Sequence, residues 1–488
     1  MTLRRIIPTL LGLCLVLCLA LPALAAEETV TLEEAITQAC IYRQEADLAD
    51  YKIPAEEFKT RFDALRKSGA LPWYITGSYN YSYDTNTNYV LTFTPSVIRD
   101  GNVDMLVYEQ KIAEILDTCV LPGMTDVQIA LALHDYLAVH TVYDSTLEKN
   151  TCYDLIVDGT SVCAGYAEAY QDLLLRVGID CLYVSSDEMD HGWNLVCIDG
   201  NWYHVDVTWD DPSPDIFGRV RHTYFLLTDA EISSGEEPHY GWDGGIPCTD
   251  TRFSDGWWRT VNGPICFDSP EICYLTRAEK TRNAFYQRDE QTGTEQLLYE
   301  EKDNYINLGQ GSYRYGHQGL ALRGGRLYFN TMDAVQYMDP ATGEIRAEYV
   351  HGGNTYISGF HIKEDTMYLT LMDHESNITN TTQPLDPLET HIHSYTHTQT
   401  APTCSEGGYT TSTCSCGITF QSTPVAPSSH TNKKAFRLDG IHYTCTHCGH
   451  TDKAPYIPEG YEFSATLFLI AGVLLLSAFL PRRRKRKS

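Results

Sequence analysis

The chain reads Ser161-Val-Cys-Ala-Gly-Tyr-Ala, then His191-Gly-Trp-Asn, then Trp202-Tyr-His-Val-Asp-Val-Thr-Trp-Asp-Asp-Pro, and these three stretches decide its fold. They place a thiol, an imidazole and a carboxylate in order along the chain, at Cys163, His191 and Asp206. A cysteine nucleophile needs a base that takes its proton and a third group that orients the base. The three residues therefore predict a nucleophile site.

The residues that follow Cys163 predict a helix. Apolar or aromatic side chains recur at helical spacing, at Tyr166, Tyr170, Leu173, Leu174 and Val177. Gly178 stands where such a helix would end, and Gly159-Thr160 marks a turn before it. Cys163 is therefore expected at a helix N-terminus, where unpaired N–H groups and the helix dipole favour a thiolate. Considered by itself, Cys163 could instead be a buried cysteine that packs as a small hydrophobe.

The histidine and the aspartate are expected on one β-hairpin. Asp199-Gly200 is a two-residue turn signal between strands predicted over 191–198 and 202–209. This register pairs Ile198 with Asn201 and makes His191 and Asp206 diagonal neighbours on one face, about 7–8 Å apart at their backbones. His191 would then take the proton of Cys163, and Asp206 would hold the imidazole in the correct tautomer.

His204 shares that face and is a rival base. We favour His191 because it begins its strand beside a polar loop that a substrate can reach.

These motifs resemble the transglutaminase-like superfamily, which has a papain-like fold, and in particular its bacterial cytokinesis-type subgroup. The resemblance covers roughly residues 105–230. It includes Gly178-Ile-Asp-Cys and an upstream stretch from Met124-Thr-Asp-Val-Gln to His134-Asp-Tyr-Leu, in addition to the three stretches quoted above. It implies an α+β core with a nucleophile helix packed on an antiparallel sheet, and a Cys-His-Asp triad. It leaves the reaction open, because the family includes amide cross-linkers, peptidases and proteins without shown activity.

The oxyanion-stabilising side chain is not evident from the sequence. Papain-type proteases carry a glutamine six residues before the nucleophile, where this chain has Val157. The backbone N–H of Cys163 could supply one donor, and Tyr143 or Tyr153 could supply another.

The two ends predict export and membrane anchoring. Residues 1–26 carry two arginines, an apolar run and a small-residue cleavage pattern, which is typical of a signal peptide, although a single N-terminal anchor is the alternative. Residues 463–480 lack charge and predict a transmembrane helix, and the basic segment 481–488 would stay cytoplasmic. We therefore expect a single-pass protein of the cell membrane with its N-terminal portion outside, typical of Gram-positive bacteria.

The charge of the chain argues against nucleic acid as a partner. The sequence has 36 basic and 64 acidic residues, and eight of the basic ones lie in the two ends, which leaves a strongly acidic outer part. Such acidity suits a basic or neutral substrate, or it only keeps an exported protein soluble.

The chain between the two ends divides into four regions. We expect an α/β region over 27–104, a catalytic domain over 105–250, a β-rich module over 251–385 and a Cys/His-rich segment over 386–455. Nine of the 16 cysteines lie between Cys40 and Cys273, so one can remain unpaired as a nucleophile, and Cys181 and Cys197 could form a disulfide.

The Cys/His-rich segment predicts a structural zinc site of zinc-ribbon type. Its candidate ligands are Cys414, Cys416, Cys445 and Cys448, with His393, Cys404, His430 and His447 as spare donors. Two disulfides with one odd cysteine are the alternative in an exported protein. Catalysis itself requires no cofactor.

Together these features predict an exported, membrane-anchored cysteine enzyme that acts on peptide or protein amides at the cell envelope through an acyl-enzyme. Peptidase or amidase activity is favoured over cross-linking, because a transferase must exclude water. The alternatives are a non-catalytic binding or scaffolding protein that keeps the fold, and an adhesin whose β-rich module and Cys/His-rich segment carry binding.

Overall fold

The computed structural model describes residues 30–98, 102–235, 237–279, 282–302, 305–309, 312–315, 319–387, 395–404, 406–415, 417–421, 425–427, 432–437, 440–445, 448 and 451–453. The chain divides into two compact units, one formed by residues 1–399 and 410–424 and the other by residues 400–409 and 425–488.

A small α/β module precedes the predicted catalytic core. Its elements are α2 (Leu32–Tyr42), β1 (Ala46–Asp47), η1 (Ala49–Tyr51), α3 (Ala55–Lys67), β2 (Ile75–Tyr83) and β3 (Val90–Val97). The strands form an antiparallel sheet in the order β1-β3-β2. Phe58 and Phe62 of α3 pack on Phe93 of β3, with ring centroids 5.2 and 5.5 Å apart, so the module has an apolar core of its own.

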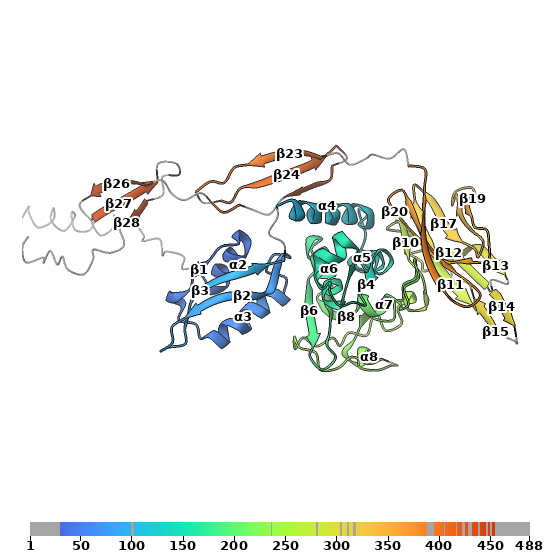
Figure 1. The fold of residues 1–488 in the computed structure, drawn as a ribbon, viewed down its shortest axis with the longest axis horizontal. Helices are drawn as coiled ribbons and strands as arrows, with labels where there is room; N and C mark the ends of the chain where they lie inside the picture. Colours follow the sequence, from blue (N-terminus) through green and yellow to red (C-terminus); the bar gives the residue numbers. More distant parts are fainter. Residues whose placement is uncertain are drawn as a thin grey trace, which may run out of the picture. The chain divides into compact units, whose positions relative to one another are not determined.

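The core that carries the candidate site combines helices with a four-stranded antiparallel sheet (Figure 1). Its elements are α4 (Asn102–Cys119), α5 (Asp126–His140), β4 (Val142–Tyr143), η2 (Asp154–Asp158), β5 (Thr160–Ser161), α6 (Cys163–Arg176), β6 (Cys181–Ser186), β7 (His191–Ile198), β8 (Asn201–Val205), α7 (Val207–Asp210), β9 (Phe225–Leu227) and α8 (Asp229–Ile232). The sheet order is β6-β7-β8-β9, and α6 packs against β6 and β7. The predicted nucleophile helix on an antiparallel sheet is confirmed.

The helix α6 has the predicted limits. It begins at Cys163 and ends at Arg176, and Gly178 follows with a φ of 84°, which an L side chain rarely adopts.

The β7–β8 hairpin has the predicted register, with Ile198 opposite Asn201. Asp199 and Gly200 have φ values of 49° and 79°, and this pair of positive angles is what a type I′ turn requires. The second strand is shorter than predicted and ends at Val205. The reason is that Asp206 caps the short helix α7, so residue 208 lies in a helical turn and not opposite residue 191.

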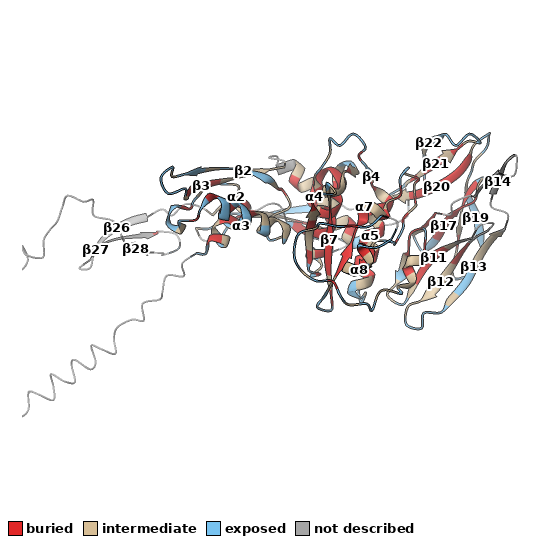
Figure 2. Ribbon diagram, turned by 90° about the horizontal axis from the view of Figure 1, so that it is seen from below, coloured by how far each residue is buried: buried red, intermediate tan, exposed pale blue. Residues whose placement is uncertain are grey.

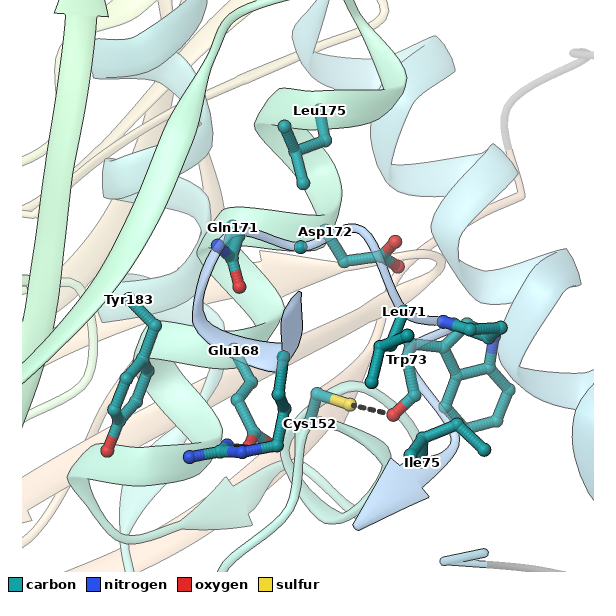
Figure 3. Close-up of a pocket in the computed structure, with 12 residues that line it drawn as sticks. Leu71, Trp73, Ile75, Cys152, Glu168, Gln171, Asp172, Leu175 and Tyr183 are labelled. Carbon is teal, nitrogen blue, oxygen red and sulfur yellow. Dashed lines mark hydrogen bonds and ion pairs between the residues drawn. The ribbon is translucent and has the colours of Figure 1, made fainter. Parts of the chain in front are cut away.

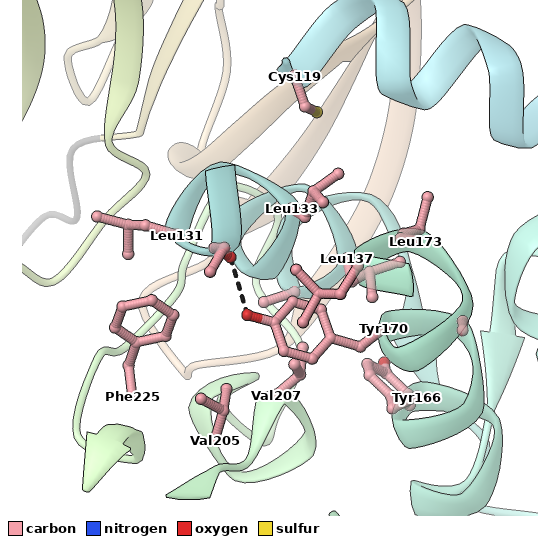
Figure 4. Close-up of a cluster of buried hydrophobic side chains, with 14 of the residues drawn as sticks. Cys119, Leu131, Leu133, Leu137, Tyr166, Tyr170, Leu173, Val205, Val207 and Phe225 are labelled. Carbon is pink, nitrogen blue, oxygen red and sulfur yellow. Dashed lines mark hydrogen bonds between the residues drawn. The ribbon is translucent and has the colours of Figure 1, made fainter. Parts of the chain in front are cut away.

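The main hydrophobic cluster lies between α5, α6 and the sheet (Figure 4). Leu131, Leu133 and Leu137 of α5 and Tyr170 of α6 are buried, and the Tyr170 hydroxyl donates to the Ala130 carbonyl at 2.9 Å. Truncating one such leucine to alanine costs about 2–5 kcal/mol of stability. Figure 2 shows that buried residues dominate these elements, so the helix that carries the thiol is held on a packed base.

A β-rich region follows the core. Its elements are η3 (Trp257–Thr260), β10 (Cys266–Ser269), β11 (Ile272–Glu279), β12 (Arg282–Asp289), β13 (Glu295–Lys302), β14 (Tyr305–Gly309), β15 (Ser312–Tyr315), β16 (Leu320–Arg323), β17 (Arg326–Asn330), β18 (Ala334–Met338), β19 (Ile345–Val350), β20 (Tyr356–Lys363), β21 (Thr366–Met372) and β22 (Ile378–Pro384). Strands β10–β13, β16–β19 and β20–β22 form consecutive antiparallel meanders, and β14 and β15 form a hairpin.

Two further three-stranded sheets end the described chain. The first contains β23 (Tyr395–Thr400), β24 (Tyr409–Cys414) and β25 (Thr419–Gln421), and the second contains β26 (Asn432–Arg437), β27 (Gly440–Cys445) and β28 (Thr451–Lys453). Among the described residues, no helix is long and apolar enough to cross a membrane. The predicted signal peptide over 1–26, the span over 463–480 and the tail over 481–488 all lie outside the described residues.

Candidate active site

Cys163 is the first residue of α6 and is partly exposed. Its N-cap is Val162, whose apolar side chain offers no acceptor to the first turn, so the thiol lies at an uncapped helix N-terminus, where the helix dipole favours a thiolate. The helix starts in a confined space, because a Cβ at Gly165 would lie 2.6 Å from the Thr151 carbonyl oxygen. Glycine at this position therefore lets α6 begin where the thiol is needed.

His191 and Asp206 meet as the hairpin register predicts. His191 opens β7, and its Nε2 lies 2.6 Å from Oδ2 of Asp206. The other oxygen of Asp206, Oδ1, accepts the backbone N–H of Trp209 at 3.1 Å. The carboxylate is buried and has one oxygen on the imidazole and the other on a helix N-terminus, so its orientation is set from both sides.

The imidazole of His191 lies between two indoles and reaches the thiol. Its ring centroid is 5.7 Å from Trp193 and 5.2 Å from Trp209, and both pairs are stacked. Cys163 lies close enough to raise the pKa of the imidazole. Because Nε2 is engaged by Asp206, Nδ1 is the nitrogen left to take a proton from the sulfur.

The electrostatics of the three groups favour a charged imidazole and a charged carboxylate. Burial disfavours the imidazolium, but the charge and hydrogen bond of Asp206 and the hydrogen bond to Cys163 outweigh it and raise the pKa of His191 to about 10. Burial also acts against the Asp206 carboxylate, yet His191 and His239 hold its pKa well below the ordinary value. The base is thus set to carry a proton next to the sulfur.

His239 is a site residue that the sequence did not reveal. Its Nε2 lies 2.8 Å from Oδ2 of Asp206, on the same oxygen that His191 uses. The ring is fully buried, packs 4.1 Å from Trp209 between centroids, and has no hydrogen-bond partner for Nδ1 within the described structure. The proton of a neutral His239 therefore lies on Nε2 and is donated to Asp206. No motif or periodicity marks this position, because it is brought to the site from 33 residues beyond Asp206.

The rival base His204 is excluded by its partners. It is buried, the Trp193 indole N–H donates to its Nδ1 at 3.0 Å, and its Nε2 donates to Asp229 at 2.9 Å. With both ring nitrogens engaged by Trp193 and Asp229, His204 has no free site for a proton from Cys163.

The two tyrosines expected as oxyanion donors, Tyr153 and Tyr143, lie in different environments. Tyr153 is buried in an aromatic stack with Trp73 and Tyr108, with ring centroids 6.2 and 6.3 Å away, so its ring supports the core. Tyr143 is exposed, and burial of part of its ring and the charge of Cys163 raise its pKa, which places it near the thiol. Val157 lies within η2 and offers no polar side chain.

Tyr183 of β6 lies against the residue that follows His191. A Cβ on Gly192 would lie 2.7 Å from Cζ of Tyr183. Burial and the charges of Glu168 and Cys163 raise the pKa of Tyr183. Its hydroxyl therefore stays protonated and can donate a hydrogen bond.

Asp210 and Asp211, which follow Asp206 in the third motif, hold the elements around the site together through hydrogen bonds. Asp211 accepts the Tyr166 hydroxyl of α6 at 2.7 Å. Asp210 accepts the backbone N–H groups of Thr223 and Tyr224 and lies 3.2 Å from Nε2 of His134. These contacts tie α7, α5 and α6 to one another directly behind Asp206.

A buried His-Asp network continues from this brace. Asp135 Oδ1 lies 2.9 Å from Nδ1 of His134 and 2.9 Å from Nε2 of His222. Burial acts against charge on both groups, but hydrogen bonds to Asp135 and Asp210 raise the pKa of His134 to about 9, and the two histidines lower that of Asp135 to about 2. The network is therefore an ion-paired support of the core.

A cavity of about 50 Å³ lies beside α6, and its lining does not include the three site residues (Figure 3). Figure 3 shows Glu168 and Gln171 of α6, Tyr183 and Trp73 around it. Arg66 of the N-terminal module lies 3.2 Å from Glu168, whose pKa burial raises to about 7. Small-molecule pockets usually measure about 300–1,000 Å³, so this cavity is too small to hold a peptide.

The cysteines of the core remain thiols. The predicted Cys181–Cys197 disulfide is absent from the described structure, because Cys181 lies opposite Val196 and neighbouring strand residues point to opposite faces of the sheet.

The structure brings together two of the four predicted zinc ligands in the Cys/His-rich segment, Cys445 and Cys448, with the spare donor Cys404. The sulfurs of Cys404, Cys445 and Cys448 lie within 4.8 Å of one another. Cys414 ends β24, and Cys416 lies outside the described residues, so their predicted role as ligands stays a prediction.

Known proteins resemble this chain in the region of the site. The family model for the transglutaminase-like superfamily matches residues 114–207. The kyphoscoliosis peptidase of Mus musculus is 22% identical over 153 residues, which is 26% of this chain and 23% of the relative. The kyphoscoliosis peptidase of Homo sapiens is 26% identical over 139 residues, which is 24% of this chain and 21% of the relative. The chain thus matches less than a quarter of the length of these curated relatives.

A solved structure of a TGase is 11% identical and covers 34% of this chain and 50% of its own, with a TM-score of 0.20. This structural similarity is too low to carry an argument, so the resemblance to the transglutaminase-like superfamily rests on the sequence matches. The matched segment contains Cys163, His191 and Asp206 in the arrangement described above. The predicted resemblance to the transglutaminase-like superfamily is thus confirmed for residues 114–207, which match its family model.

Proposed function

We propose that this chain is a cysteine enzyme that acts on peptide or protein amides through an acyl-enzyme at Cys163. The observation that carries the proposal is the position of His191, whose Nε2 lies 2.6 Å from Asp206 and whose pKa the neighbouring Cys163 raises. The peptidase names of the curated relatives and the transglutaminase-like family agree with this kind of enzyme.

The first half of the reaction forms the acyl-enzyme. Nδ1 of His191 takes the thiol proton, and the sulfur of Cys163 attacks the amide carbonyl carbon. When the tetrahedral intermediate collapses, the C–N bond breaks and His191 returns the proton to the leaving amine. A thioester on Cys163 remains, while Asp206 keeps the imidazole in orientation and stabilises its positive charge.

The second half releases the acyl group. His191 takes a proton from water or from an amine, which attacks the thioester carbonyl, and the C–S bond breaks to return the thiolate of Cys163. We favour water as the acceptor, because Cys163 is partly exposed and a transferase would need to exclude water from it.

Two donors are suited to the negative oxygen of the tetrahedral intermediate. The backbone N–H of Cys163 is the first of α6 and has no acceptor within the helix. Tyr183 has a protonated phenol that lies against Gly192 and whose pKa the charge of Cys163 raises, and exposed Tyr143 is the alternative. Together they would replace the glutamine that the sequence lacks at Val157.

We also propose that the enzyme is exported and held in the cell membrane. Support comes from the sequence of residues 1–26 and 463–488. Its substrates would then be peptides or proteins of the cell envelope, with basic or neutral ones favoured by the acidic chain.

The test is alkylation of the protein with limiting iodoacetamide, followed by mass spectrometry, for the wild type and His191→Ala. We expect selective labelling of Cys163 that falls sharply in the variant. A Cys163 that reacts no faster than half-buried Cys197, or that ignores the loss of His191, would instead favour the scaffolding alternative. A scaffold should also keep its cellular role when Cys163 is replaced by serine.

A further inference from the structure

Three sulfur atoms come together in the second compact unit, far along the sequence from the candidate active site. Sγ of Cys404 lies 3.6 Å from Sγ of Cys445, and Cys448 completes a group whose sulfurs all lie within 4.8 Å of one another. A disulfide would require about 2.05 Å between two sulfurs. In a tetrahedral zinc site with Zn–S bonds of about 2.3 Å, neighbouring sulfurs lie about 3.8 Å apart. The observed separation is too long for a disulfide and is compatible with two ligands of one ion.

The local fold presents two of the thiols as a knuckle. Cys445 is the last residue of β27, and β28 begins at Thr451, with Thr444 paired to Thr451. Cys445 and Cys448 therefore belong to the connection of a β-hairpin, with the Cys-x2-Cys spacing typical of zinc knuckles. Cys404 comes from a separate stretch, so an ion held by all three would join two segments 41 residues apart.

The short distances between the sulfurs favour a cation among them once the thiols ionise. Three thiolates at this separation repel one another unless a positive ion lies between them. Cys445 is buried while Cys448 is exposed, so one side of the group is shielded and the other is open to an incoming ion.

The segment around the three cysteines has a very small hydrophobic core among the described residues. Within the described residues from 395 onward, the buried hydrophobic side chains are Cys414, Phe420 and Cys445. A segment that buries so little apolar surface usually depends on disulfides or a metal for its fold.

We propose that Cys404, Cys445 and Cys448 bind one zinc ion as thiolates, and that this ion is a structural staple of the Cys/His-rich segment. This ligand set replaces the predicted one by exchanging Cys414 and Cys416 for Cys404. A fourth donor, which can be water, completes the tetrahedron. The proposal is independent of the activity at Cys163.

The test is zinc content per chain, measured by inductively coupled plasma mass spectrometry on the full chain purified in detergent without chelators. We expect one zinc per chain in the wild type and in Cys197→Ser, a matched control whose thiol lies on β7 outside the group. Cys404→Ser and Cys448→Ser should each lower zinc affinity at least tenfold, since even outer-shell partners of a metal are worth 10–100-fold. Cobalt exchanged into the wild type should show thiolate-to-cobalt charge-transfer absorption that both variants lose.

Three results would overturn the proposal. They are a wild type purified without zinc and unable to take up zinc or cobalt, a Cys404–Cys445 disulfide found by peptide mapping without reductant, and zinc content that both serine variants retain. Alkylation of Cys163, which lies in the other compact unit, reports whether the variants keep the rest of the fold. Unchanged Cys163 labelling together with lost zinc separates loss of a ligand from general unfolding.

Discussion

Asp206→Asn tests the arrangement of the candidate site most directly. The carboxylate accepts hydrogen bonds from Nε2 of His191 and of His239 on Oδ2, and from the Trp209 backbone N–H on Oδ1. An asparagine has only one oxygen. If this oxygen faces the Trp209 N–H, the amide NH2 faces the imidazoles. His191 must then carry its proton on Nδ1, the atom that should receive the proton of Cys163. If the oxygen faces the imidazoles, the NH2 opposes the Trp209 N–H.

The magnitude follows from the lost charge. With about 4 Å between the centres of the imidazolium and the carboxylate and an effective dielectric constant of about 20, their attraction is about 4 kcal/mol. At 1.36 kcal/mol per tenfold change, this corresponds to about a thousandfold in the population of the imidazolium–thiolate pair. Because the asparagine keeps part of the hydrogen bonding, we expect alkylation of Cys163 to slow by about 10²–10³-fold.

The assay needs a pH at which this range can be observed. At pH 5.5 an ordinary cysteine, with a pKa of about 8.5, is about 0.1% thiolate, so an unassisted thiol reacts about a thousandfold more slowly than a full thiolate. Iodoacetamide labelling is therefore measured at pH 5.5 by mass spectrometry and normalised to Cys197 in the same sample. A variant with unchanged circular dichroism that labels within threefold of the wild type would refute the assigned roles of His191 and Asp206.

Three further predictions follow from the same contacts. His239→Leu removes one charge-assisted hydrogen bond to Asp206 and should slow Cys163 labelling about tenfold. His239→Gln keeps a hydrogen-bond donor and should restore most of the labelling rate. Equal rates in both variants would mean that the ring only fills space. Tyr183→Phe should lower turnover of an amide substrate about 10²–10³-fold while labelling of Cys163 stays unchanged, and full turnover would remove Tyr183 as an oxyanion donor. The pKa of His134 is raised to about 9, above its unfolded value, so its stabilising contribution is complete below about pH 6.5 and is lost as the pH rises through about 9. Thermal melts should therefore show about 1–3 kcal/mol of stability lost between about pH 6.5 and about pH 9. Asp210→Asn should weaken this dependence of stability on pH. A wild-type melting temperature that does not change with pH would contradict the ion-paired network.

Local rules predicted much of the site. The helical spacing of Tyr166, Tyr170 and Leu173 set the limits of α6, and Gly178 marked its end. The Asp199-Gly200 turn determined the strand register, because a two-residue turn leaves one pairing and side chains alternate with a period of two. That register alone brought residue 206 within reach of residue 191.

Other features depended on contacts that no local pattern encodes. The end of β8 at Val205 is decided by Asp206, which caps α7 and therefore leaves the strand directly after Val205, the last residue that pairs with β7. His204 looked equivalent to His191 in the strand pattern, and only the neighbouring Asp229 and Trp193 show that its nitrogens are engaged.

The sequence by itself determined which residues form the helix, the hairpin and the pair His191–Asp206, since these follow from periodicity and turn chemistry over short stretches of chain. Only the tertiary structure decided that His239 shares Asp206, that Tyr183 lies against Gly192 and that Cys404 joins Cys445 and Cys448. The physical reason is that these contacts join segments tens of residues apart. Their geometry depends on how whole layers pack, and packing leaves no periodic signal along the chain.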